Sequence, residues 1–217
     1  KMEGIACERV FAPAPDMETL LRERGMPLFT LETKTPLREL DILGFTLQYE
    51  LSYTNILNML DLSGIPLRRN DRGADDPFIA GGGPCAFNPE PLADFFDFFL
   101  LGDGEESLPV VLDAYRDWKQ SSSDRNIFLS TIRKLPGVYM PGDYLPVYGA
   151  DGTVERIEAT RPGLPASIRK AAVPSMEETP YPETPVVPLV EVVHDRSVVE
   201  TFRGCTRGCR FCQAGMI

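Results

Sequence analysis

Short apolar runs alternate with helix-like stretches through the first half of the chain. Residues 41–47, 78–80 and 95–101 are rich in strand-forming apolar side chains, and each run leads into glycine or polar residues. Between and after them, residues 56–62 and 107–119 carry apolar side chains at helical spacing. This alternation predicts an α/β fold, a Rossmann-like parallel sheet with flanking helices. The run at residues 41–47 suits a strand buried on both faces of such a sheet.

Weaker signals lie ahead of this unit. Residues 9–12 and 28–31 read as short strands, and Asp16 suits the N-cap of a helix that Gly25 ends. A complete unit of this type would have one more strand and helix ahead of residue 10, so we expect the first domain to lack them.

The second half of the chain differs in character. A helix is expected from Asp124 to residue 134, followed by a β-hairpin over residues 144–157 with an Asp-Gly turn. Prolines are dense over residues 162–188, which reads as a linker, and strands are expected at residues 186–193 and 197–202. We therefore divide the chain into a Rossmann-like domain (1–120), a connecting segment (121–188) and the start of a further domain (189–217).

The strand ends are the first candidate binding sites. Ligands of open α/β sheets bind beyond the carboxyl ends of the strands. The candidate cofactor-binding residues at these ends are Gly81, Gly82, Gly83, Gly102 and Gly104. For Gly81, Gly82 and Gly83, the plainer alternative is a tight turn after a strand. Glu105 and Glu106 either lie in a ligand pocket or are acidic residues that favour the N-terminus of a helix.

Composition narrows the class of protein. The formal net charge of −10 disfavours non-specific binding of nucleic acid by the whole surface. The sequence shows neither a signal-peptide pattern nor an apolar run of membrane-spanning length. The 5 cysteines do not form a disulfide framework, so we expect reduced thiols and a cytoplasmic protein.

Three of the cysteines form a compact motif. Cys205, Cys209 and Cys212 have the spacing C-x3-C-x2-C, and the aromatic Phe211 precedes the third. Three thiolates can hold three corners of a cubane iron–sulfur cluster and leave the fourth iron open to a ligand. The motif therefore predicts a metal site with room for a substrate or cofactor.

Zinc is the structural alternative. A structural zinc site needs four ligands, and the single histidine, His194, lies eleven residues before the motif, while Cys7 and Cys85 form no pair. Cys85 reads instead as a small buried residue.

The arginines around the motif have two interpretations. Arg203, Arg207 and Arg210 would offset the negative charge of a thiolate-ligated cluster or contact an anionic substrate, or they are simply solvated surface residues.

The cysteine motif resembles that of the radical S-adenosylmethionine (radical SAM) superfamily. The resemblance implies that Cys205, Cys209 and Cys212 ligate a 4Fe–4S cluster in the loop after the first strand of a (β/α) barrel. It also implies that the open iron binds S-adenosylmethionine, which is cleaved to a 5′-deoxyadenosyl radical, with an electron donor such as flavodoxin or ferredoxin. The catalytic residues stay unknown, and we expect the 217 residues alone to be inactive.

The upstream half extends this resemblance. Gly81-Gly82-Gly83-Pro84, residues 88–90 and residues 102–106 are similar to the cobalamin-binding-type Rossmann domain that precedes many radical SAM barrels. Residues 45–61 are similar to an uncharacterised subfamily with this arrangement. The sequence lacks D-x-H-x-x-G, the motif that supplies a histidine to cobalamin. Two interpretations stay open: cobalamin binds without a protein histidine, or the domain keeps only the fold.

Together these features predict a radical SAM iron–sulfur enzyme that modifies an unknown substrate by hydrogen abstraction, leading to methylation, methylthiolation or rearrangement. An RNA or ribosome-related substrate is among the candidates, and no membrane partner is expected. The alternative is a non-catalytic Rossmann-like module that binds a corrinoid or a protein partner.

Overall fold

The computed structural model describes residues 2–180, 187, 193, 196, 199–212 and 214. The strand expected at residues 186–193 lies largely outside these residues, and His194 lies wholly outside them. Of the strand expected at residues 197–202, residues 199–202 are described and form no strand, so that prediction was wrong for them. Among the described residues, none of the helices is long and apolar enough to cross a membrane.

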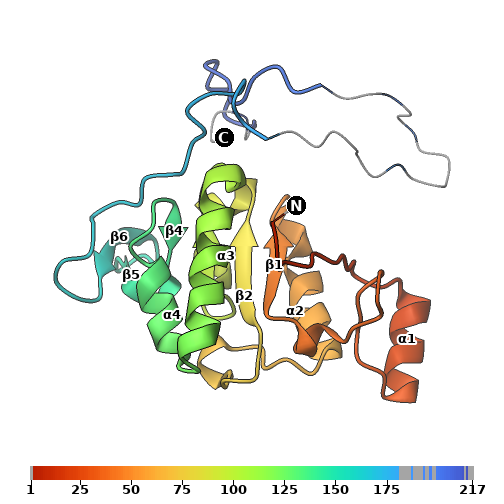
Figure 1. The fold of residues 1–217 in the computed structure, drawn as a ribbon. Coiled ribbons are helices and arrows are strands. Elements are labelled where there is room, and N and C mark those ends of the chain that lie inside the picture. The colour runs from red at the N-terminus through yellow and green to blue at the C-terminus, as the bar shows by residue number, and fades with distance from the viewer. Residues whose placement is uncertain are drawn as a thin grey trace.

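A four-stranded sheet lies at the centre of the molecule (Figure 1). Its strands are β1 (Ile42–Thr46), β2 (Phe78–Gly82), β3 (Phe98–Leu100) and β4 (Val138–Tyr139), in the order β1-β2-β3-β4. The first three strands run parallel and β4 pairs with β3 antiparallel. The predicted α/β fold with a parallel sheet is confirmed, and β4 is an addition that the sequence did not indicate.

Helices cover both faces of this sheet. The helices are α1 (Pro15–Arg24), α2 (Tyr53–Leu62), α3 (Gly104–Ser121) and α4 (Arg125–Ile132). Figure 1 shows α3 and α4 on one face of the sheet and α2 on the other. Each of these helices was predicted, because each carries apolar residues at helical spacing or a clear terminal signal.

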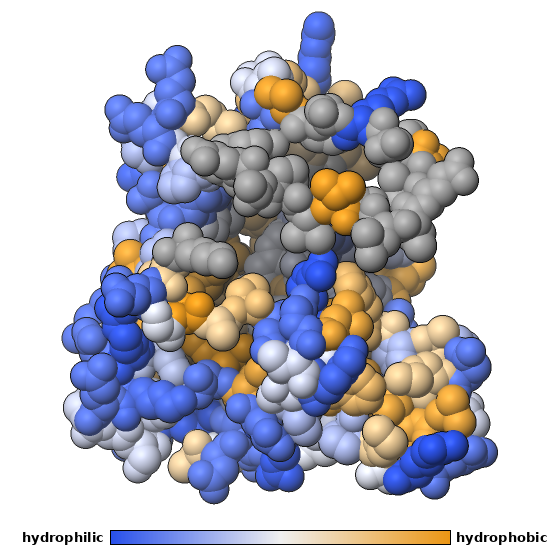
Figure 2. Space-filling model, turned by 45° about the vertical axis from the view of Figure 1, so that its right-hand side comes forward, coloured by the Kyte–Doolittle hydropathy of each residue, from blue (hydrophilic) through white to orange (hydrophobic). Residues whose placement is uncertain are grey.

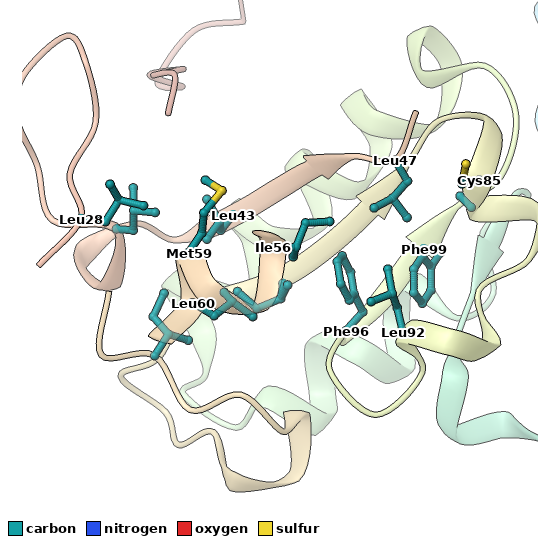
Figure 3. Close-up of a cluster of buried hydrophobic side chains, with 14 of the residues drawn as sticks. Leu28, Leu43, Leu47, Ile56, Met59, Leu60, Cys85, Leu92, Phe96 and Phe99 are labelled. Carbon is teal, nitrogen blue, oxygen red and sulfur yellow. The ribbon is translucent and has the colours of Figure 1, made fainter. Parts of the chain in front are cut away.

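Alternation along the strands divides the core into two clusters. On the α2 side, Ile79 packs with Leu60 and Phe99, and Figure 3 shows this cluster. On the α3 and α4 side, Phe78 packs with Phe128, with ring centroids 4.6 Å apart. Successive strand residues point to opposite faces, so β2 supplies both clusters and is buried on both sides.

Several local predictions were wrong in detail. Residues 9–12 form no strand, and residues 28–31 contribute only one bridge, between Phe29 and Pro36. β1 is an edge strand in which Gly44 is exposed, so it is not buried on both faces. The N-cap of α1 is Ala14 rather than Asp16, because Pro15 takes the first helical position.

The predicted hairpin is confirmed as β5 (Tyr144–Tyr148) and β6 (Val154–Ala159). At the turn, Gly152 has φ 80°, which explains its place there. Short 3₁₀ helices complete the described structure at Leu37–Glu39, Glu50–Ser52, Arg69–Asp71, Pro84–Phe87, Glu90–Leu92 and Pro141–Asp143.

Residues 169–173 return to the carboxyl end of β3. The Ala171 N–H donates to the Leu101 carbonyl at 2.9 Å, and the Asp103 N–H donates to the Ala171 carbonyl at 3.0 Å. The connecting segment is thus bonded to the sheet together with α4 and β4. The proposed boundaries at residues 120 and 188 stay predictions.

Hydrophobic and hydrophilic residues are interspersed on the molecular face in Figure 2. Large apolar side chains are nevertheless exposed near the cysteine motif, where Phe202 is 73% and Phe211 is 93% exposed.

Candidate functional site

The cysteine motif lies in residues 199–212, and this segment is bound to the first turn of α3 through Arg203. The Arg203 guanidinium forms ion pairs with Asp103 at 3.1 Å and with Glu105 at 2.6 Å. Both carboxylates directly follow β3, so the contact is at the carboxyl edge of the parallel strands. Figure 1 shows the C-terminal segment (blue) beyond this end of the sheet, near the start of α3.

Arg203 is held on a third side by Glu200, whose carboxylate lies 2.8 Å from Nε. Hydrogen bonds to Glu200 and Glu105 raise the pKa of Arg203 above its ordinary value. In turn, the hydrogen bond from Arg203 lowers the pKa of Glu105 and of Glu200. The arginine side chain is only 21% exposed, so the interpretation of Arg203 as a solvated surface residue was wrong.

The acidic turn after β3 therefore has a structural role at this edge. Besides its ion pair with Arg203, Asp103 accepts a hydrogen bond from the Val173 N–H at 2.8 Å, so it also binds the connecting segment. Glu105 is one of two glutamates in the first turn of α3, as the interpretation based on the helix dipole predicted. Glu106 forms no ion pair with any described residue.

Two left-handed glycines shape the loop itself. Gly204 has φ 79° and Gly208 has φ 65°, conformations that favour glycine. The Arg207 N–H donates to Cys205 Sγ at 3.5 Å, and the Cys212 N–H donates to the Cys209 carbonyl at 3.1 Å. The loop thus has one local contact at the first cysteine and a turn between the second and the third.

All three cysteine side chains of the motif are exposed. Within the part of the chain that the structure describes, no three His, Cys, Asp or Glu side chains are gathered closely enough to hold a metal ion. The ligand roles of Cys205, Cys209 and Cys212 stay predictions that depend on their spacing.

Three of the candidate cofactor-binding glycines are packed against the chain itself. A Cβ at Gly81 would lie 2.6 Å from the Phe99 ring, and one at Gly102 would lie 2.0 Å from the Ala171 carbonyl oxygen. At Gly83, which has φ 99°, a Cβ would lie 3.1 Å from the Leu47 carbonyl oxygen. Figure 3 shows Leu47 and Phe99 in this region. These glycines permit close packing of the sheet and its turns, which supports the plainer alternative.

The other two glycines have more room. A Cβ at Gly82 would have an ordinary contact of 3.8 Å, and one at Gly104 would meet nothing within 4 Å. Their role as cofactor-binding residues stays a prediction.

Two tyrosines that follow β1 differ in their burial. Tyr49 is 58% exposed, whereas Tyr53 packs against the core beside the buried Cys85. Burial raises the pKa of Tyr53 to about 12, with smaller contributions from Cys85 and Glu50. Cys85 is 3% exposed, which confirms its interpretation as a small core residue.

The fold and the loop define an α/β domain that binds the segment carrying a three-cysteine motif. A family model described as radical SAM proteins, N-terminal, matches residues 1–141. This match covers more than half of the chain, and the chain belongs to that family.

One relative is an uncharacterised protein of Methanocaldococcus jannaschii, MJ0966. It is 28% identical over 215 residues, which cover 99% of this chain and 39% of that protein. The chain therefore spans about two fifths of the length of this curated relative. No solved structure matches the chain.

Proposed function

We propose that the chain supplies the cluster-binding loop of a radical SAM enzyme, with Cys205, Cys209 and Cys212 as ligands of a 4Fe–4S cluster. The observation that carries the proposal is the C-x3-C-x2-C motif, which begins two residues after Arg203, in a chain of the radical SAM N-terminal family. The ion pairs of Arg203 support it further, because they bind the start of the loop to a folded domain.

The donor set suits such a cluster. Three soft thiolates from this motif would hold three irons of a cubane cluster and leave the fourth iron for S-adenosylmethionine. The Arg207 N–H that donates to Cys205 Sγ is the kind of hydrogen bond that stabilises a ligating thiolate. Cys205, Cys209 and Cys212 would hold the cluster, which when reduced would supply the one electron needed to cleave S-adenosylmethionine into methionine and a 5′-deoxyadenosyl radical.

The residues of this chain hold the loop and its charges. Arg203 fixes the start of the loop against Asp103 and Glu105. Arg207 and Arg210, which form no ion pair with a described residue, supply positive charge beside thiolates that would otherwise repel one another. The role of the α/β domain in this proposal is to position the loop.

The test is anaerobic reconstitution of the chain with iron and sulfide. We expect about four irons and four sulfides per chain, with the visible absorption and reduced-state EPR signal of a 4Fe–4S cluster. Cys205→Ala should abolish the signal, and Cys7→Ala is the matched control because Cys7 is also exposed but lies outside the motif. Bound zinc without sulfide, or loss of the cluster in Cys7→Ala alone, would contradict the proposal.

The rest of the reaction follows from the family and not from the geometry. We propose a cytoplasmic enzyme whose cluster is reduced by flavodoxin or ferredoxin and whose radical abstracts hydrogen from its substrate. An RNA or ribosome-related substrate is one class to test.

Cobalamin is a separate part of the proposal and has less support. The close packing at Gly81, Gly83 and Gly102 leaves Gly82 and Gly104 as the candidate contacts at the carboxyl edge. Titration of the chain with hydroxocobalamin, followed by its visible spectrum, tests whether the domain binds a corrinoid.

A further inference from the structure

A cavity of about 550 Å³ lies at the edge of the sheet opposite the cysteine loop. Asp97 comes directly before β3 and Asp143 follows the antiparallel β4, so both lie at the amino end of the parallel strands. Asp103 and Glu105, which bind Arg203, follow the other end of β3. The lining includes five arginines, Arg69, Arg72, Arg125, Arg133 and Arg161.

Two buried carboxylates organise four of these arginines. Asp97 forms ion pairs with Arg72 at 3.0 Å and Arg125 at 3.1 Å. Asp143 forms ion pairs with Arg133 at 2.7 Å and with Arg161. Both aspartate side chains are only 4% exposed. The cavity therefore has an excess of three positive charges in a chain whose net charge is −10.

The Asp97 side of the cavity is structural. Arg72 is fully buried, and its guanidinium also donates to the carbonyls of Pro66, Leu67 and Phe95 at 2.6–3.0 Å. Arg125 lies over the Phe78 ring, 3.9 Å from its centroid. These arginines hold the start of β2 and β3 in place.

On the Asp143 side of the cavity, two arginines have N–H groups that form no hydrogen bond with a described residue. Arg133 uses Nε and Arg161 uses Nη2 for the aspartate, and their other N–H groups form no hydrogen bond with a described residue. A guanidinium has five N–H groups in a planar fork, so most of the donors of both side chains stay available.

Arg69 is the fifth arginine, and it forms no ion pair with a carboxylate of any described residue. Its Nε is buried and makes no hydrogen bond with any part of the chain that the structure describes. The side chain packs over Gly142, where a Cβ would lie 2.7 Å from Nη1. A buried donor without a partner is costly, so its presence beside unused arginine donors points to a ligand.

We propose that this cavity binds the phosphoryl group of a phosphorylated small molecule through Arg69, Arg133 and Arg161. The planar guanidinium fork matches phosphate oxygens, and an excess of three positive charges suits a dianion better than a monoanion. The volume lies within the range of small-molecule sites, roughly 300–1,000 Å³, and exceeds what one phosphate fills. The cavity therefore also accommodates the organic part of the ligand.

The proposal is independent of the iron–sulfur proposal, because the cavity shares no residue with the cysteine loop. The test is isothermal titration of the chain, in chloride buffer of constant ionic strength, with inorganic phosphate, ribose 5-phosphate and ribose. We expect ribose 5-phosphate to bind more tightly than inorganic phosphate, and ribose not to bind. Absence of binding by both phosphate compounds would overturn the proposal, and equal binding would assign the site to free phosphate.

Arg69→Gln identifies the site. It should weaken the binding of ribose 5-phosphate at least about tenfold, because it removes a charge-assisted hydrogen bond. The control is Arg68→Gln, since Arg68 neighbours Arg69 in sequence but forms a surface ion pair with Asp94. If Arg69→Gln does not fold, Arg161→Gln replaces it, because Arg161 is 47% exposed. Equal weakening in Arg68→Gln would place the binding elsewhere and overturn the assignment.

Discussion

The contact between Arg203 and Glu105 predicts how fast trypsin cleaves the chain after Arg203. Trypsin must take the arginine side chain into its own acidic pocket, so Arg203 has to leave its carboxylates first. Glu105→Gln removes one of those carboxylates while keeping the shape of the side chain. We expect this change to speed cleavage of the Arg203–Gly204 bond.

The size of the effect follows from the contact. Glu105 accepts two hydrogen bonds from Arg203, at 2.6 and 3.2 Å, and the two side chains are 29% and 21% exposed. Exposed ion pairs contribute roughly 0.2–1 kcal/mol, and hydrogen bonds to charged groups about 1.5–3 kcal/mol. An intermediate value of about 1–2 kcal/mol corresponds to cleavage roughly 5–30 times faster.

The assay has controls within the chain. Cleavage after Arg207, in the same loop but without an ion pair to a described residue, should not change and serves as the internal reference. Glu106→Gln removes an equivalent charge from the first turn of α3 without touching Arg203, so it controls for the helix dipole. The reasoning is refuted if Glu105→Gln leaves the rate at Arg203 unchanged, or if Glu106→Gln raises it equally.

Two further predictions concern stability, measured by urea unfolding with the fluorescence of the single tryptophan, Trp118. Arg203 holds the pKa of Glu105 below its ordinary value of 4.5. The contribution of the ionised Glu105 to the free energy of unfolding is therefore complete above pH 4.5 and is lost as the pH falls through the lowered pKa. The difference in unfolding free energy between the wild type and Glu105→Gln should therefore be constant near neutral pH and vanish in acid; an unchanged difference at low pH would contradict this. Gly81→Ala should destabilise the fold by about 1–3 kcal/mol, because its Cβ would lie 2.6 Å from the Phe99 ring. Gly104→Ala, in open space, should cost little, and tolerance of alanine at both positions would argue against close packing at Gly81.

The elements that were predicted correctly have local signals. The helix α2 has an apolar stripe and a glycine stop, and the hairpin of β5 and β6 has its Asp-Gly turn. The apolar run of β1 showed that it was a strand but not that it lies at the edge. The position of a strand in the sheet depends on which other strands it pairs with. β4 has only two residues, and it is a strand because it pairs with β3.

The site was less predictable because its contacts are distant in sequence. The spacing of the cysteines is local and was visible, whereas Arg203 and Glu105 are separated by 98 positions. The same holds for the arginine-lined cavity, where Asp97 and Arg125 are 28 positions apart. A sequence motif can predict which side chains bind a metal, but it cannot show which arginine forms an ion pair with which carboxylate.

The three arginines of the loop illustrate this limit and what the fold adds to it. The sequence alone does not distinguish Arg203, Arg207 and Arg210, because each lies within two residues of a cysteine. Within the described residues, Arg203 alone of the three forms ion pairs, and its partners are the carboxylates of Asp103, Glu105 and Glu200. Without its charge these carboxylates would repel one another, and a compact lysine ammonium could not contact all three as the guanidinium fork does. Arg203 is therefore the arginine that determines where the loop begins, while Arg207 and Arg210 remain available to the cysteines.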